Sequence, residues 1–157
     1  MRGRSYTAPI FFAFATISCA VYSKQQPVAG DKAVALAYVQ AWNAHDTAAI
    51  DTLLAGDGVH EDVAQNFRGV GAKAVNEFLR GLITAEPDFK WNVTNSMEDG
   101  RLVGIEWTWT GTYTGKDPSG KQVSNRRTSG RGASVVEVDD GRIKRFTDYY
   151  DDASFFR

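Results

Sequence analysis

The stretch Gly141-Arg-Ile-Lys-Arg-Phe-Thr-Asp-Tyr-Tyr-Asp151 decides the predicted fold, and the turn signal Asp139-Asp140-Gly141 leads into it. Two acidic residues followed by Gly are typical of a tight β-hairpin turn. Beyond the turn the residue types alternate with a period of two, which is the period of a strand. One side of that strand would carry Lys144, Phe146, Asp148 and Tyr150. A carboxylate therefore lies between two aromatic rings on that side.

Two interpretations of Asp148 follow from this pattern. If its side of the strand faces the interior, the carboxylate lies in an apolar pocket. Desolvation there raises the pKa of a carboxyl group toward values that are useful for acid–base catalysis. Alternatively, Asp148 lies on a solvated edge of the sheet, because carboxylates are rarely buried unless they are paired or functional. Alternation alone leaves both interpretations open.

Size and charge restrict the class of protein. The chain has 157 residues and is 43% hydrophobic, which favours one globular domain. Its formal net charge is −1, but the first 29 residues contain three basic side chains and no acidic one. The rest of the chain therefore holds 15 basic and 19 acidic residues, a net charge near −4. This balance argues against nucleic acid as the main partner.

Residues 1–22 are typical of a signal peptide, because Arg2 and Arg4 precede an apolar segment at residues 8–21. That segment is shorter than the about 20 residues of a transmembrane helix. Residues 16–19, which end at Cys19, resemble the lipobox of bacterial lipoproteins, in which this Cys is lipidated. Simple secretion and an uncleaved N-terminal anchor are the alternatives. We expect an exported, periplasmic or extracellular domain, anchored to a membrane only through its N-terminus if Cys19 is lipidated. Residues 23–30 would form a polar tether.

Three helices are expected at the start of the domain, which spans residues 31–157. Asp31 can N-cap the first, in which apolar residues recur at helical spacing as far as Trp42. Asp46 caps a second helix, which glycines at positions 56 and 58 end, and residues 59–63 form a short extended segment. The third helix is expected at about residues 71–85, before Pro87.

From Phe89 onward the hydrophobic period changes to two, which predicts strands. Strands at residues 89–93, 103–113 and 123–138 would precede the final strand, with Gly130 and Gly132 weakening or bulging the third of them. Helices followed by an antiparallel meander indicate an α+β fold. We expect a strongly curved, mainly antiparallel sheet that wraps around the three helices and forms a cone with an internal pocket.

Several short motifs together resemble the SnoaL-like branch of the nuclear transport factor 2-like superfamily, which contains polyketide cyclases and ester cyclases. In chain order, between Asp31 and Phe156, they are Ala41-Trp-Asn-Ala-His-Asp46, Phe67-Arg-Gly69, Glu86-Pro-Asp88, Gly111-Thr-Tyr-Thr-Gly115, Gly120-Lys121, Asp140-Gly-Arg-Ile143 and Asp148-Tyr-Tyr-Asp151. No single motif is specific, but their order and spacing together are evidence for the fold, and much weaker evidence for a reaction. The resemblance implies a cone of three helices on a curved sheet, a hydrophobic pocket and a homodimer.

The same resemblance implies a site. In the family's cyclases one pocket Asp acts as acid and base in an intramolecular aldol closure, and Asp148 matches it best. Related limonene epoxide hydrolases pair such an Asp with an Arg-x-Asp triplet, where this chain has Trp107-Thr-Trp109, so we do not expect their reaction. Tyr113 stands where ester cyclases usually have His. Where cyclases have a His on the next-to-last strand, this chain offers Ser129 or Arg131.

Asp148 is therefore the candidate catalytic residue, acting as a general acid or base. The candidate substrate-binding residues are Trp42, His60, Trp107, Tyr113, Arg127, Arg131 and Tyr150. Either Arg could hold an enolate or a carboxylate. In the alternative interpretation, Asp148 accepts a hydrogen bond from Arg127 or Trp42 and only braces the cone.

The short acidic segment His60-Glu61-Asp62 lacks the spacing of a metal site, so we expect no metal and no cofactor. We expect His60 or Asp62 to point into the pocket mouth instead. Two functions then fit the sequence. The first is an exported, cofactor-free cyclase, isomerase or lyase that acts on a small apolar carbonyl compound through Asp148. The second is a non-catalytic module of the same fold that binds a hydrophobic ligand or another protein. A scaffold dimer with a filled pocket is a third.

Overall fold

A computed structural model describes residues 30–117 and 119–151 of the chain. The predicted signal peptide with Cys19, and residues 23–29 of the predicted tether, lie outside the described residues. Within the described part, none of the helices combines the length and the apolar character that crossing a membrane requires.

Three helices precede most of the sheet: α1 (Asp31–Asn43), α2 (Thr47–Leu53) and α3 (Gly71–Ala85). Asp46 caps α2 as predicted, because its carboxylate accepts a hydrogen bond from the Ala49 amide at 2.9 Å. The prediction for α1 was wrong in one detail. Gly30 is its N-cap residue, and Asp31 lies in the first turn, where a negative charge still interacts favourably with the helix dipole.

The first strand is longer than the sequence predicted. β1 (Leu54–Asp62) begins directly after α2, so its two glycines lie within the strand and do not end a helix. Gly58 shows why a glycine is needed there. A Cβ at this position would lie 2.6 Å from the Ile143 carbonyl oxygen of the final strand, so only Gly lets the two backbones approach this closely.

Six strands form one sheet. The other five are β2 (Phe67–Val70), β3 (Lys90–Asp99), β4 (Leu102–Lys116), β5 (Gln122–Asp139) and β6 (Arg142–Tyr150). Their order is β2-β1-β6-β5-β4-β3, and every neighbouring pair is antiparallel except β1 and β6, which are parallel. Asp140 and Gly141 form the predicted turn into β6, with positive φ angles of 49° and 69° that suit a two-residue hairpin turn.

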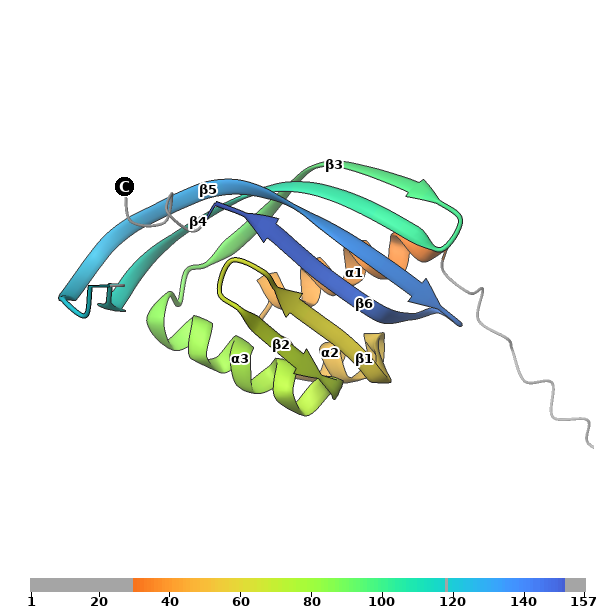
Figure 1. Cartoon of the computed structure of the whole chain (residues 1–157), viewed down its shortest axis with the longest axis horizontal. Coiled ribbons are helices and arrows are strands. Elements are labelled where there is room, and N and C mark those ends of the chain that lie inside the picture. The colour runs from red at the N-terminus through yellow and green to blue at the C-terminus, as the bar shows by residue number, and fades with distance from the viewer. Residues whose placement is uncertain (1–29, 118, 152–157) are drawn as a thin grey trace, which may run out of the picture.

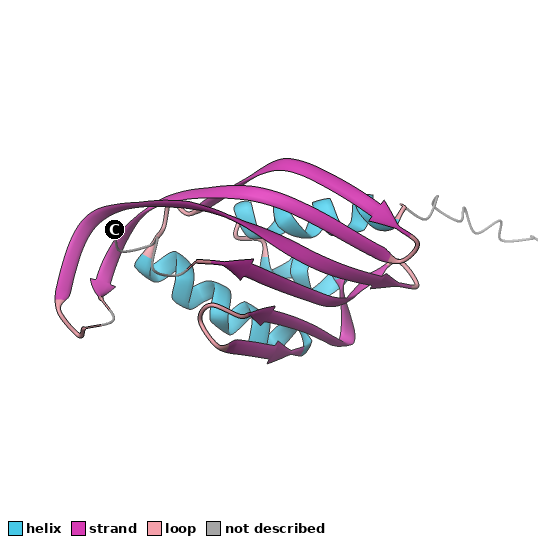
Figure 2. Ribbon diagram, turned by 45° about the horizontal axis from the view of Figure 1, so that its top comes forward, coloured by secondary structure: helices cyan, strands magenta, loops and turns pink. Residues whose placement is uncertain are grey.

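The strongly curved sheet holds the three helices on its concave side (Figure 1). The core lies between these two layers, where large side chains of the helices such as Tyr38, Trp42 and Leu79 are buried together with Ile105 and Phe146 of the sheet. The sheet is open, so the predicted cone does not close. At one end β4 and β5 run on beyond the other strands as a two-stranded arm (Figure 2).

The alternation predicted for β6 holds only after its first residues. The register between β5 and β6 shifts where Val138 pairs with Ile143 and Glu137 pairs with Arg145, which leaves Lys144 as an extra residue. Such a bulge reverses the alternation. Ile143 is therefore buried in the core, whereas Lys144 forms an ion pair with Asp57 on the surface.

The glycines of β5 have a different role from the one expected. Pairing with β4 runs through both without a register shift, since Gly130 lies opposite Trp109 and Gly132 opposite Trp107. A Cβ at Gly130 would lie 2.1 Å from the Trp109 ring, and one at Gly132 would lie 2.4 Å from the Trp107 ring. The missing side chains make room for two indoles that lie across β5.

Candidate functional site

A hollow opens between the helices and the concave face of the sheet. Its empty space is about 400 Å³ including the part open to solvent, and the cavity proper is about 30 Å³. Twelve residues line it: Trp42, His60, Asp62, Gln65, Phe78, Leu82, Phe89, Trp91, Trp107, Trp109, Asp148 and Tyr150. All four tryptophans of the chain are among them. The hollow is thus an aromatic pocket with a few polar groups, which is the usual composition of a small-molecule site.

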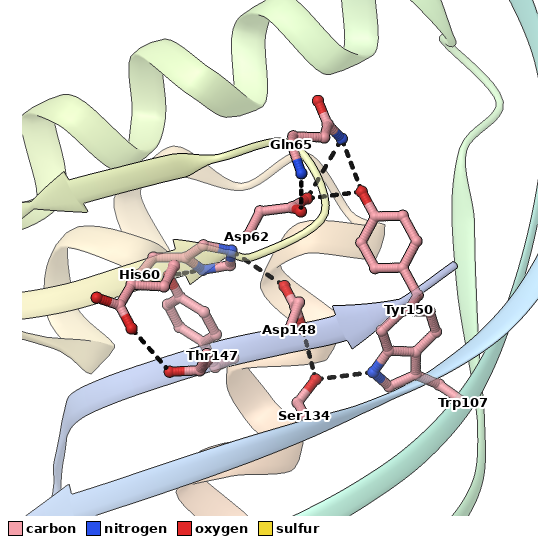
Figure 3. A network of polar contacts seen from close by, with 10 residues as sticks. His60, Asp62, Gln65, Trp107, Ser134, Thr147, Asp148 and Tyr150 are labelled. Atoms are coloured by element: carbon pink, nitrogen blue, oxygen red, sulfur yellow. Dashed lines mark hydrogen bonds and ion pairs between the residues drawn. The ribbon is translucent and has the colours of Figure 1, made fainter. Parts of the chain in front are cut away.

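Asp148 lies in this hollow and is only 2% exposed. The Ser134 hydroxyl donates a hydrogen bond of 2.5 Å to Oδ1, and Nε2 of His60 lies 3.2 Å from Oδ2 (Figure 3). Ser134 in turn accepts a hydrogen bond of 2.7 Å from the Trp107 indole nitrogen. Both carboxylate oxygens therefore have polar partners, and these are not the Arg127 or Trp42 of the bracing alternative.

The sequence analysis placed His60 or Asp62 at the pocket mouth. In the structure His60 lies deeper than that. The ring is 1% exposed and stacks between Trp42 and Phe146, with centroid distances of 4.7 and 5.2 Å. Its Nδ1 lies 3.2 Å from the Tyr38 hydroxyl. Burial raises the pKa of Tyr38, which therefore keeps its proton and can donate it to Nδ1. In that arrangement Nε2 carries the imidazole hydrogen and donates to Asp148.

A second carboxylate lies beside the first. Asp62 of β1 is the direct lateral neighbour of Asp148 in the parallel pair β1–β6 and is 6% exposed. Tyr150 donates a hydrogen bond of 2.8 Å to Oδ2, while the Gln65 backbone and side-chain amides donate to Oδ1 and Oδ2 at 3.0 and 3.2 Å (Figure 3). Burial raises the pKa of Asp62, and the charge of Asp148 adds to this effect, although the hydrogen bonds from Gln65 and Tyr150 oppose it.

The structure brings only some of the predicted binding residues together. Besides Asp148, four of them line the hollow, namely Trp42, His60, Trp107 and Tyr150. Tyr113 lies on the arm, where its hydroxyl donates to the Lys116 carbonyl oxygen at 2.8 Å. Arg127 and Arg131 are exposed. They alternate along β5 with buried residues such as Thr128 and Ser134, so they lie on its other face.

The predicted binding set lacked three polar residues of the site: Gln65, which lines the hollow, Ser134, which donates to Asp148, and Asp62, which the sequence analysis named only as an alternative to His60. For Asp62 a signal existed, since it follows His60 by two residues and so shares a face with it on any strand. Gln65 lies in the turn between β1 and β2, which no residue pattern predicted. Within residues 30–117 and 119–151, no group of three or more His, Cys, Asp or Glu side chains is placed to hold a metal ion.

A third buried carboxyl group lies outside the hollow. Glu86 follows the last residue of α3 and is 0% exposed. The Thr128 hydroxyl donates a hydrogen bond to its Oε1, whereas Oε2 has no hydrogen-bond partner within the described residues. Burial therefore raises the pKa of Glu86. This carboxyl ties the end of α3 to the arm of the sheet.

We expect Glu86→Gln to raise the free energy of unfolding at neutral pH. The folded-state pKa of Glu86 lies above the unfolded value, so the wild type loses stability as the pH rises from the unfolded pKa through the folded one. Gln does not titrate and still offers Oε1 to Thr128. Urea unfolding at about pH 4 and pH 7 should show a gain only at the higher pH. Glu106→Gln, at an exposed position, is the control. Equal destabilisation at both pH values would contradict the prediction.

The chain was compared with curated protein sequences and with solved structures. No curated protein sequence matches the chain. Among solved structures, the chain resembles IdmH, a proposed polyketide cyclase from Streptomyces antibioticus, with a TM-score of 0.70 and 17% identity over 82% of this chain and 96% of that one. It also resembles a proposed polyketide cyclase from Xanthomonas campestris, with a TM-score of 0.64 and 26% identity over 76% and 89% of the two chains.

A third similar structure is an epoxide hydrolase of the limonene epoxide hydrolase-like type from Mycobacterium tuberculosis. Its TM-score is 0.63, with 25% identity over 80% of this chain and 86% of that one. The family model of the SnoaL-like polyketide cyclases matches residues 32–157. That match covers nearly all of the predicted domain, and the three helices on an open, mostly antiparallel sheet have the fold of the same group. The chain therefore belongs to the SnoaL-like polyketide cyclase family.

Proposed function

We propose that the protein is a cofactor-free enzyme of the cyclase or isomerase type that acts on a small apolar carbonyl compound. Asp148 would remove a proton from the carbon next to the carbonyl group and return it later in the reaction. The observation that carries this proposal is the position of Asp148, whose carboxylate is nearly buried and lines an aromatic hollow. A general base needs a water-poor site and a path to the substrate, and the hollow offers both.

The proposed reaction uses groups that are already in place. Asp148 takes the proton, the electron pair of the broken C–H bond forms a C=C bond, and the π pair of the carbonyl group moves onto its oxygen to give an enolate. The enolate carbon can then attack a second carbonyl group, whose oxygen takes the proton back from Asp148, or Asp148 can return the proton at another carbon. The hydrogen bonds from Ser134 and His60 fix the carboxylate, so it need not reorganise during the transfer. His60 and Ser134 are thus positioning residues, which act through Asp148.

The size of the cavity restricts the substrate. A site for a drug-sized ligand is typically about 300–1,000 Å³, and one water needs at least about 10–15 Å³. A cavity of about 30 Å³ has room for about two or three waters, so a substrate would place only one end in it and would extend through the open part of the hollow. The export of the domain, lipidation at Cys19 and a homodimer remain predictions from the sequence.

Proton exchange tests the proposal without knowledge of the natural substrate. We expect the protein to accelerate the exchange of α-hydrogens of cyclohexanone for deuterium in D₂O, at a rate proportional to protein concentration. Proton NMR of the ketone measures this directly. A ketone that binds in the hollow but exchanges no faster than in buffer would contradict the enzymatic proposal and support the ligand-binding alternative.

A further inference from the structure

The aromatic side chains of the hollow are arranged like the walls of a box. Trp107, Trp109 and Tyr150 meet pairwise at interplanar angles of 63°, 61° and 66°, with centroid distances of 5.2 to 5.9 Å. Trp91 lies 5.6 Å from Trp107, and Trp42 lies 5.4 Å from Trp91. These last two pairs are tilted by 39° and 40°, and all five rings line the hollow, so aromatic side chains surround it on several sides. An apolar ligand does not require this arrangement, but an organic cation is attracted by it.

The charge of the hollow has the matching sign. Its twelve lining residues include two carboxylates and neither Lys nor Arg. The carboxylates of Asp62 and Asp148 are lateral neighbours on β1 and β6, so each is close to another acid. Burial raises the pKa of Asp62, and repulsion by the neighbouring carboxylate of Asp148 raises it further. A bound cation would relieve the repulsion.

We propose that the hollow binds a small organic cation, namely a methylated ammonium group, held by the aromatic walls and the Asp62–Asp148 pair. The group would be the charged end of the carbonyl compound on which the proposed enzyme acts, so that the substrate would not be wholly apolar. This inference rests on the proposed function for the use of the site. Binding itself can be tested without turnover.

The hydrogen bonds in the hollow favour a methylated ammonium over a primary amine. Asp62 already accepts bonds from Gln65 and Tyr150, and Asp148 accepts one from Ser134 and lies beside His60. A primary ammonium would have to find acceptors for its three hydrogens among these occupied oxygens. A quaternary ammonium has no N–H group and needs only negative potential and aromatic faces, which the hollow supplies.

Choline and its uncharged carbon isostere, 3,3-dimethylbutan-1-ol, provide the test, because they share shape and differ in charge. We expect isothermal titration calorimetry to show choline binding at least about tenfold more tightly, since each cation–π contact contributes about 0.5–2 kcal/mol and about 1.4 kcal/mol is tenfold. Equal affinity for both compounds, tighter binding of the isostere, or no binding of choline at millimolar concentration overturns the proposal.

Matched variants show which residues cause the preference for choline over the uncharged isostere. Asp62→Asn should reduce the preference for choline and leave the affinity for the isostere nearly unchanged. Asp57→Asn is the control, because it makes the same change on the same strand at an exposed residue outside the hollow. If Asp62→Asn fails to fold, Trp109→Leu should reduce the same preference. A preference that survives in the folded variants overturns the assignment.

The result separates this inference from the proposed function. Cyclohexanone carries no charge, so its α-hydrogen exchange does not depend on a cation site. Exchange without a preference for choline contradicts only the cation site. A preference for choline without exchange contradicts only the acid–base function of Asp148.

Discussion

Asp148→Asn should lower the rate of α-hydrogen exchange on the order of 10²–10⁴-fold, which is the usual contribution of a positioned acid or base. Asn has nearly the shape of Asp and keeps one oxygen that can accept the hydrogen bond from Ser134 or from His60. It cannot take a proton from carbon at neutral pH. The rate should therefore fall while ketone binding persists, and NMR exchange rates together with a binding titration measure the two effects separately.

The control for this variant is Asp139→Asn, because Asp139 is exposed and pairs with Arg101 at the end of β5. Its exchange rate should equal that of the wild type. Ser134→Ala provides an intermediate case, since it removes one hydrogen bond to Asp148 but not the base. A folded Asp148→Asn protein with the wild-type exchange rate would show that another group moves the proton.

Gly132→Ala should reduce both stability and activity. The new Cβ would lie 2.4 Å from the Trp107 ring and 2.7 Å from the Tyr149 carbonyl oxygen, so the indole and the backbone of β6 both have to move. Overpacking of this kind costs about 1–3 kcal/mol of unfolding free energy. Trp107 also donates the hydrogen bond that holds Ser134 against Asp148, so its displacement should lower the exchange rate as well.

Gly81→Ala makes the same substitution where there is room for it. No atom lies within 4 Å of a Cβ at Gly81, which is exposed in the middle of α3. Ala favours the helix over Gly by about 1 kcal/mol, so this variant should be more stable than the wild type. Urea unfolding of both variants tests the pair. Two shifts of the same sign would show that the space beneath Trp107 is not the cause.

The position of Ser134 shows which part of the pairing between β5 and β6 could be predicted from local sequence patterns. A two-residue turn at Asp140-Gly141 would place Ser134 opposite Thr147. The bulge at Lys144 moves the register by one residue, so Ser134 meets Asp148 instead. The turn was predictable from its residue types, but the bulge was not, because no Gly or Pro marks it. The inward direction of Asp148 was one of two interpretations that alternation permitted. The bulge at Lys144 turns Asp148 inward, because without it Thr147 would lie opposite Ser134.

The expectation that Arg127 and Arg131 lie in the pocket differs from these cases, because the sequence itself argues against it. Val136 and Val138 are apolar residues of the same strand, and counting back in twos from them puts Ser134 and Thr128 inside and both Arg outside. The information was therefore in the sequence. The contact between His60 and Asp148 could not be predicted from the sequence, because it requires β1 to lie beside β6. A strand pairing between distant segments leaves no local pattern.

The parallel pairing of β1 and β6 also bears on how a nascent chain matures. Among the strands that the structure describes, β6 is the last to be synthesised, yet it lies between β1 and β5 in the sheet. Until it emerges from the ribosome, both neighbours expose unpaired edges, which are sites of aggregation. Asp62 and Tyr150, which meet at the mouth of the hollow, are 88 residues apart in the chain. Such distant contacts slow folding, so the edges of β1 and β5 stay exposed until β6 pairs with both of them.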